Sequence, residues 1–148
     1  MIMGKLKINK DNLKINPQEK KYNNIVFDLS SITENKTYSF GYFKNDNIRE
    51  QNEAYREFHK KIMELGKKSY IDMIYESKNT SFEKIPYKEF KEGFKGSLDA
   101  SGIVSKDSSL LVFRFCKQKY RIICKDDINQ SNVLHIIGFD FNYSAYNH

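Results

Sequence analysis

The chain has 148 residues, a hydrophobic fraction of 39%, a charged fraction of 30% and a formal net charge of +6. This length fits one domain with a buried core, and no run approaches the roughly 18 apolar residues that a membrane-spanning helix needs. The basic amino terminus lacks the apolar stretch of a secretory signal, so we expect a cytoplasmic protein. The net charge permits a polyanionic partner without requiring one.

Residues 1–21 are rich in Lys and Asn and are predicted to form a flexible basic arm before a single α+β domain at 22–148. Two strands are expected next, at 24–32 and 37–43. In the second, Tyr38, Phe40 and Tyr42 alternate onto one face, as in a half-buried strand. A row of rings on a sheet is also how some RNA-binding modules stack bases.

The clearest helix follows these two strands. Its apolar residues recur with helical spacing and are Ile48, Tyr55, Phe58, Ile62 and Leu65. Asn47 and Glu50 have the spacing of a capping box, and Gly66 is well placed to end the helix. A shorter helix is expected to begin at Ser69, with Asp72 as its capping-box partner.

The segment from 78 to 109 is loop-like in sequence, with room for one helical turn. Its aromatic residues interleave with lysines, a pattern in which rings stack on bases while lysines follow phosphates. Alternatively, the aromatic rings only tether a long loop to the core. The predicted nucleic-acid contacts are Lys84, Lys88, Lys91, Lys95 and Lys119.

The last forty residues predict three short strands, at Leu110–Cys116, Tyr120–Lys125 and Val133–Asp140. With the preceding helices, they predict an α+β fold in which one or two helices pack on one face of an antiparallel sheet. Cys116 and Cys124 match no zinc spacing, and we interpret them as small core residues.

Several kinds of chemistry are not indicated by the sequence. It has no glycine-rich phosphate loop, dinucleotide fingerprint, nucleophile elbow or cluster at metal-ligand spacing, so we expect neither a cofactor nor a metal. The chemistry that remains after these exclusions is acid-base catalysis on a phosphodiester. Cleavage of RNA by its own 2′-hydroxyl needs a base, an acid and cations that hold the charge on the phosphorane.

The carboxy-terminal strands and tail concentrate the residue types for such chemistry. Arg114 and Arg121 flank a tight turn and approach each other if they share a face, which depends on the register of the loop. Alternatively, Arg114 only pairs with a carboxylate such as Asp140. The crowded ending that contains Tyr146 and His148 indicates that the tail docks back onto the sheet.

These residues resemble a known family. The segments 112–115, 121–123, 134–140 and the ending 140–148 are similar to the carboxy-terminal half of RelE/HigB-like toxins. They are closer still to a poorly characterised bacterial group that ends in an acidic residue followed by Tyr-x-His. Segments 38–43 and 82–86 also fit that group, although the family usually begins with helices and is shorter than this chain.

The resemblance implies a RelE-like α+β fold and a metal-independent endoribonuclease. Such a toxin cuts mRNA, often on the ribosome, and is restrained by a cognate antitoxin. By the same resemblance, Arg114 and Arg121 would hold the scissile phosphate, and Tyr146 or His148 would handle protons. The alternative is a non-catalytic phage or mobile-element protein that binds and inhibits a host nucleoprotein or defence complex, with 84–95 as its working surface.

Overall fold

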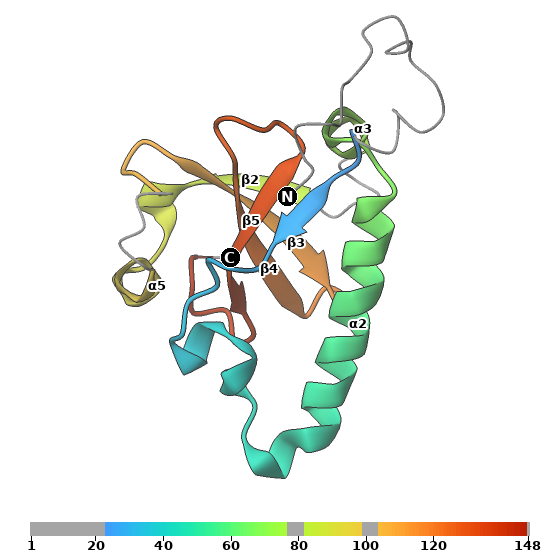
Figure 1. Cartoon of the computed structure of the whole chain (residues 1–148). Coiled ribbons are helices and arrows are strands. Elements are labelled where there is room, and N and C mark those ends of the chain that lie inside the picture. The colour runs from blue at the N-terminus through green and yellow to red at the C-terminus, as the bar shows by residue number, and fades with distance from the viewer. Residues whose placement is uncertain (1–22, 77–81, 99–103, 148) are drawn as a thin grey trace, which may run out of the picture.

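The computed structural model of the protein describes residues 23–76, 82–98 and 104–147 (Figure 1). The predicted arm and His148 therefore lie outside the described residues. The strands are β1 (Val26–Asp28), β2 (Phe82–Pro86), β3 (Ser109–Phe115), β4 (Tyr120–Asp126) and β5 (Val133–Asp140). The helices are α2 (Ile48–Gly66), α3 (Tyr70–Tyr75) and α5 (Glu92–Ser97), and the 3₁₀ turns are η3 (Lys36–Tyr38), η4 (Phe40–Tyr42), η5 (Asn45–Asn47) and η6 (Tyr87–Glu89).

The five strands form one mixed sheet in the order β1-β5-β4-β3-β2. Strands β2 to β5 pair antiparallel with their neighbours, whereas β1 runs parallel to β5 at the opposite edge. The α+β class is confirmed, and the predicted span of β5 matches the observed strand. The parallel edge strand is an addition to the expected antiparallel sheet.

Alternation along the strands separates two hydrophobic layers. Helix α2 covers one face, where Ala54 and Leu65 are fully buried against the sheet. On the other face, Phe94 of α5 and Phe90 pack over Val112 of β3. Figure 1 shows α2 along one side of the sheet and α5 at the opposite side. The sheet is thus covered on both faces, which leaves its strand ends as the open part.

The expected strand at 37–43 is wrong. The segment forms the turns η3 and η4, because the Asn35 side chain accepts a hydrogen bond from the Thr37 amide and starts a 3₁₀ turn there. Tyr38 packs on the α5 face, with its ring at 5.1 Å from that of Phe94. Phe40 packs on the α2 face, at 4.8 Å from Phe139. The three rings therefore do not form one stacking face for bases.

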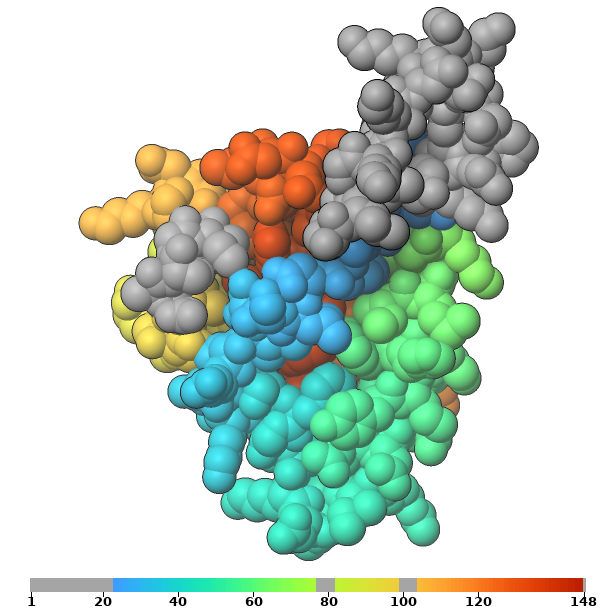
Figure 2. Space-filling model, in the orientation of Figure 1, coloured from blue at the N-terminus to red at the C-terminus, as the bar shows by residue number. Residues whose placement is uncertain are grey.

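The first predicted strand is also shorter than expected, since only β1 pairs. Beyond it, the Thr33 amide donates to the carbonyl of Ile137, so the chain from 29 to 43 runs along the remaining edge of β5. Figure 2 shows this early segment and α2 across one face of the molecule. This segment covers the part of the β5 edge that β1 does not pair with, and a covered edge cannot pair with another chain.

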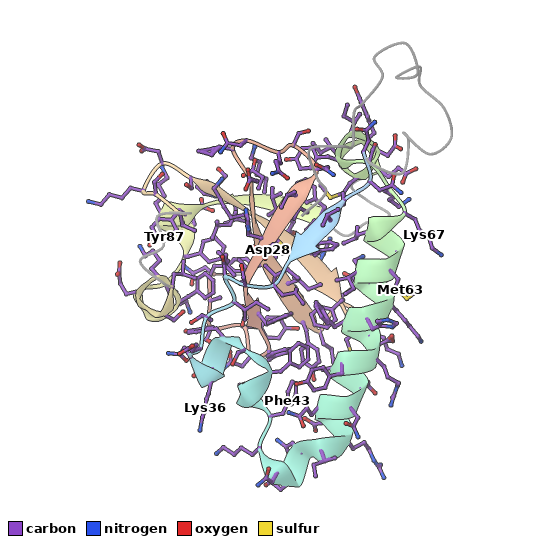
Figure 3. The ribbon with its side chains drawn as sticks, viewed as in Figure 1. Asp28, Lys36, Phe43, Met63, Lys67 and Tyr87 are labelled. Atoms are coloured by element: carbon purple, nitrogen blue, oxygen red, sulfur yellow. The ribbon has the colours of Figure 1, made fainter. Side chains whose placement is uncertain are left out.

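Helix α2 confirms the predicted helix and its end at Gly66. Asn47 precedes it, but its side chain makes no capping hydrogen bond. Of the predicted stripe, Leu65 is buried and Phe58 packs against the core, whereas Ile48 and Tyr55 are about half exposed. Ala54, which was not part of the stripe, is fully buried. Figure 3 shows Phe43 directed into the molecule beside α2, whereas Met63 and Lys67 point away from it.

Helix α3 begins as predicted, since the Ser69 hydroxyl accepts from the Asp72 amide at 3.1 Å. It buries Met73, whereas its other apolar residues Ile71, Ile74 and Tyr75 are exposed. The segment expected to be loop-like contains β2 and α5. No helix in the described ranges is long and apolar enough to cross a membrane.

Candidate functional site

Arg114 and Arg121 are directly opposite each other on neighbouring strands. The β3–β4 hairpin pairs them in register, and residues so paired have Cα atoms about 5 Å apart. Arg114 lies two residues beyond Val112, and Arg121 two before Ile123, so both belong to the α5 face of the sheet. The condition set by the sequence, that the two arginines share a face, is therefore met.

Two like charges in directly opposed positions destabilise a sheet unless other groups compensate them. Arg121 is 9% exposed, and its guanidinium Nη1 donates to the carbonyls of Gln118 and Tyr120 at 2.7 and 3.3 Å. The Nε atoms of Arg114 and Arg121 are both buried, and neither has a hydrogen-bond partner among the described residues. Buried donors without a partner are uncommon in native structures, so these two are a distinctive feature of the hairpin.

Asp140 stands opposite Arg121 on β5 and is 1% exposed. Its carboxylate accepts hydrogen bonds from the amides of Asn142, Ser144 and Ala145, at 3.4, 3.0 and 3.3 Å. These bonds organise the turn that leaves β5 and redirect the tail. Asp140 therefore shapes the exit from the last strand.

The tail docks onto the sheet as predicted. Tyr146 is 4% exposed, its backbone bridges to that of Phe90, and its tilted ring lies 5.2 Å from the Phe90 ring. The Lys91 amide donates to the carbonyl of Ala145 at 2.8 Å. Burial raises the pKa of the Tyr146 phenol, and the neighbouring Arg121 guanidinium partly opposes that rise. At neutral pH the phenol is therefore protonated and can act as an acid.

A pocket of about 400 Å³ brings three of the four predicted catalytic residues together. Its lining consists of Glu83, Ile85, Glu89, Arg114, Arg121, Tyr146 and Asn147. Glu83 is on β2 opposite Val112, which places it on the same face as the arginines. Neither glutamate is among the predicted site residues: Glu83 lies on β2, a strand that the sequence does not indicate, and Glu89 lies in η6. We call this cavity the arginine pocket.

Tyr143 lies beside Arg121 but is not part of the lining of the arginine pocket. It is about half exposed, and the Arg121 guanidinium lies over its ring at 5.6 Å from the centroid. Its backbone has a φ of 60°, in the left-handed region. Such strain in a non-glycine residue is found most often next to functional sites.

The hairpin between β3 and β4 is strained as well. Cys116, Lys117 and Gln118 have φ values of 56°, 54° and 66°, and none of them is glycine. The bond from Arg121 to the carbonyl of Gln118 helps to hold this conformation. The conformation of the β3–β4 turn therefore helps to fix the position of the Arg121 guanidinium in the arginine pocket.

His135 lies elsewhere on the sheet, between two carboxylates. Its Nδ1 is 2.6 Å from Asp28 on β1, and its Nε2 is 2.8 Å from Asp127 in the β4–β5 turn. These hydrogen bonds raise the pKa of His135 above its ordinary value, against the opposing effect of burial. The pKa values of Asp28 and Asp127 are lowered by their backbone and imidazole hydrogen bonds. The arrangement supports the interpretation of His135 as a structural residue.

The five lysines predicted to bind nucleic acid do not share one surface. Lys84 is exposed and, as the neighbour of Glu83 along β2, points to the opposite face. Lys95 pairs with Glu92 at 3.0 Å on α5, and Lys119 pairs with Glu53 of α2 at 3.5 Å. Lys88 and Lys91 are exposed beside α5, where Phe90 and Phe94 are buried in the core. Those rings tether the segment and are not free to stack on bases.

Both cysteines are buried and free, as predicted for core residues. Burial raises the pKa of Cys116 to about 11 and that of Cys124 further, so neither thiol ionises at neutral pH. In the described part of the chain, no three His, Cys, Asp or Glu side chains converge as metal ligands. No protein-family model, curated protein or solved structure matches this chain in the comparisons.

Proposed function

We propose that the protein is a RelE/HigB-like toxin, a metal-independent endoribonuclease that cleaves mRNA at the arginine pocket. The observation that carries the proposal is the opposed pair of arginines with buried, unsatisfied Nε donors. A phosphodiester supplies acceptor oxygens and a negative charge, and a guanidinium binds phosphate through paired N–H donors.

The reaction needs proton transfers at two oxygen atoms. The 2′-oxygen attacks the phosphorus and forms a cyclic phosphate, while the bond to the 5′-oxygen of the next nucleotide breaks. Tyr146 donates its proton to that leaving oxygen, because its raised pKa keeps the phenol protonated. The base is His148, as the resemblance implies, or one of the pocket carboxylates, Glu83 and Glu89. Arg114 and Arg121 stabilise the charge on the phosphorane.

The proposal includes the setting in which such a toxin acts. Its substrate would be RNA, free or on the ribosome, in the cytoplasm, and a cognate antitoxin would restrain it. Induced expression of the intact chain is then expected to arrest growth. Arg114→Gln should relieve the arrest, because it removes one cation of the pair. Arg49→Gln is the matched control, since Arg49 is an exposed arginine on α2 outside the pocket.

The variants must be compared at equal soluble levels. Equal arrest by the intact chain and Arg114→Gln would contradict a role for the arginine pocket. His148→Ala, Glu83→Gln and Glu89→Gln, tested in the same way, separate the three candidates for the base. If the intact chain itself causes no arrest, the toxin function is contradicted in that host.

A second candidate function is favoured by the exposed apolar residues of α3. Ile71 and Tyr75 are 64% and 85% exposed, which is unusual for large hydrophobic side chains on one short helix. A non-catalytic inhibitor of a host nucleoprotein or defence complex would use such a surface. That protein should express without arrest, and the double variant Ile71→Ser/Tyr75→Ser should abolish its inhibition while Arg114→Gln leaves it unchanged.

A further inference from the structure

A basic pocket adjoins the arginine pocket through Arg114. It has a volume of about 310 Å³ and lies between α2 and the β3–β4 hairpin. Its lining consists of Glu57, Lys60, Lys61, Glu64, Arg114, Phe115, Cys116, Lys117 and Gln118. Arg114 lines both cavities, because it sits on β3 just beyond the last residue that pairs with β2. We call this second cavity the helix–hairpin pocket.

The most informative residue of this pocket is Lys61. It projects from α2 and is 8% exposed, which is rare for a lysine unless an anion accompanies it. In the described ranges, the one carboxylate within 4.0 Å of its Nζ is that of Glu64, at 3.9 Å. That distance is too long for a hydrogen bond, and the Glu64 side chain is about half exposed.

The charges around Lys61 do not cancel. Burial lowers the pKa of Lys61, Glu64 partly offsets this effect, and the positive charge of Arg114 lowers the pKa again. Lys60 is paired with Glu57 at 3.5 Å, so the second carboxylate of the pocket is also engaged. The four cations and two carboxylates of the lining leave a formal charge of +2.

We propose that the helix–hairpin pocket binds the phosphate that neighbours the scissile phosphate in the RNA chain. Lys61 and Lys117 hold this second phosphate, and Arg114 lies between the two phosphates. The RNA backbone then passes around the open end of β3, from the arginine pocket to the side of α2. This inference rests on the proposed function, and it adds the direction in which the substrate leaves the site.

The size and chemistry of the pocket fit a phosphate and not a whole nucleotide. Its volume is close to the smallest that ligand pockets have, and only Phe115 contributes an aromatic ring. A base would have no exposed ring to stack on, because Phe115 is 4% exposed. The contacts are therefore electrostatic and independent of base identity.

The test compares two uncleavable ligands. Both are fluorescently labelled oligoadenylates with 2′-deoxyribose at every position and no terminal phosphate, one with a single internucleotide phosphate and one with two. We expect the intact protein to bind the two-phosphate ligand about tenfold more tightly, as an added charge-assisted hydrogen bond predicts. The variant Lys61→Met/Lys117→Gln should reduce this ratio to about one and leave binding of the one-phosphate ligand unchanged.

The variant is chosen to preserve the fold. Methionine keeps the unbranched apolar stem that Lys61 buries, and Lys117 is exposed. The control, Lys67→Met/Lys106→Gln, removes the same charge at exposed positions that line neither pocket. Its ratio should stay at about ten. The salt dependence of two-phosphate binding should also weaken in the first variant, by roughly 0.7 in the logarithmic slope for each phosphate that the protein no longer neutralises.

The outcomes separate this inference from the proposed function. If the intact protein binds both ligands equally, or if the first variant keeps the tenfold ratio, the second phosphate site is refuted while RNA binding at the arginine pocket stands. If the intact protein binds neither ligand, both proposals fail. Loss of one-phosphate binding in Arg114→Gln with the ratio abolished in Lys61→Met/Lys117→Gln supports both.

Discussion

The packing of the Tyr146 ring and its proposed role as an acid can be separated by two substitutions. The ring is 4% exposed and packs against Phe90. Truncating a buried aromatic side chain costs about 3–5 kcal/mol, and we expect Tyr146→Ala to fall at the lower end because a chain end can relax. Tyr146→Phe keeps the ring and should lower the free energy of unfolding by about 1 kcal/mol, the usual value of one hydrogen bond.

The catalytic effects should not follow the same order. Removing a general acid slows a reaction by about 10²–10⁴-fold. Tyr146→Phe should therefore lose most single-turnover RNA cleavage although it remains folded. Urea denaturation followed by circular dichroism gives the stability, and gel analysis of a labelled RNA gives the rate. The control is Tyr75→Ala, which should change the stability by less than about 0.5 kcal/mol because Tyr75 is exposed.

Two results would refute this reasoning. Cleavage by Tyr146→Phe at the rate of the intact protein would show that the hydroxyl does not act as the acid. A Tyr146→Ala protein as stable as the intact chain would show that the tail does not pack on the sheet in solution.

Three further predictions concern the fold that holds the site. His135 has a raised pKa, so its bonds to Asp28 and Asp127 stabilise the protein fully below its ordinary pKa of 6.5 and are lost as the pH rises through the folded value. The lowered pKa values of the two aspartates mean that their contribution is present above 3.8 and lost as the pH falls through their folded values. The difference in urea midpoint between the intact protein and His135→Gln should therefore be largest between about pH 4 and 6.5. A difference of the same size at pH 9 would contradict this. Gln118→Gly should raise the free energy of unfolding by about 1 kcal/mol, because glycine adopts a φ of 66° without strain; a lower urea midpoint would argue against a strained hairpin. Gly138→Ala should lower the melting temperature and cost about 1–3 kcal/mol, since its Cβ would lie 3.0 Å from a phenyl carbon and 3.3 Å from a carbonyl oxygen; an unchanged melting temperature would mean that the packing around Gly138 is loose.

The carboxy-terminal sheet was predictable because local pattern and tertiary environment agree there. Strands β3 to β5 are continuous apolar runs separated by polar turns, and the structure buries them on both faces. The opposition of Arg114 and Arg121 depended on the register of a hairpin with three left-handed residues. None of those residues is a glycine, so the sequence predicts a turn there but does not indicate its left-handed conformation or the register that follows from it.

The segment 37–43 shows why periodicity misled. Its rings alternate as in a strand, but the chain passes the edge of β5 and sends Tyr38 to one core and Phe40 to the other. Two successive turns thus produce a spacing of two without a strand. Tertiary packing decides such short aromatic segments more than local preference does.

The parts of the site that sequence reasoning missed come from distant or short elements. Glu83 lies on the edge strand β2, whose five residues include two charges and a proline, a composition that does not indicate a strand. Lys61 is one of 21 lysines, and only the packing of α2 against the hairpin distinguishes it. The partners of His135 are 107 and 8 residues away along the chain.

Ribonuclease activity at the arginine pocket is tested most directly by cleavage of a labelled RNA by the purified chain in the presence of a metal chelator, beside Arg114→Gln and Arg49→Gln. We expect fragments that end in a 2′,3′-cyclic phosphate with the intact chain and with Arg49→Gln, and a loss of at least about 100-fold in rate with Arg114→Gln. Intact RNA with all three proteins, or equal cleavage by all three, would contradict the assignment of ribonuclease activity to the arginine pocket.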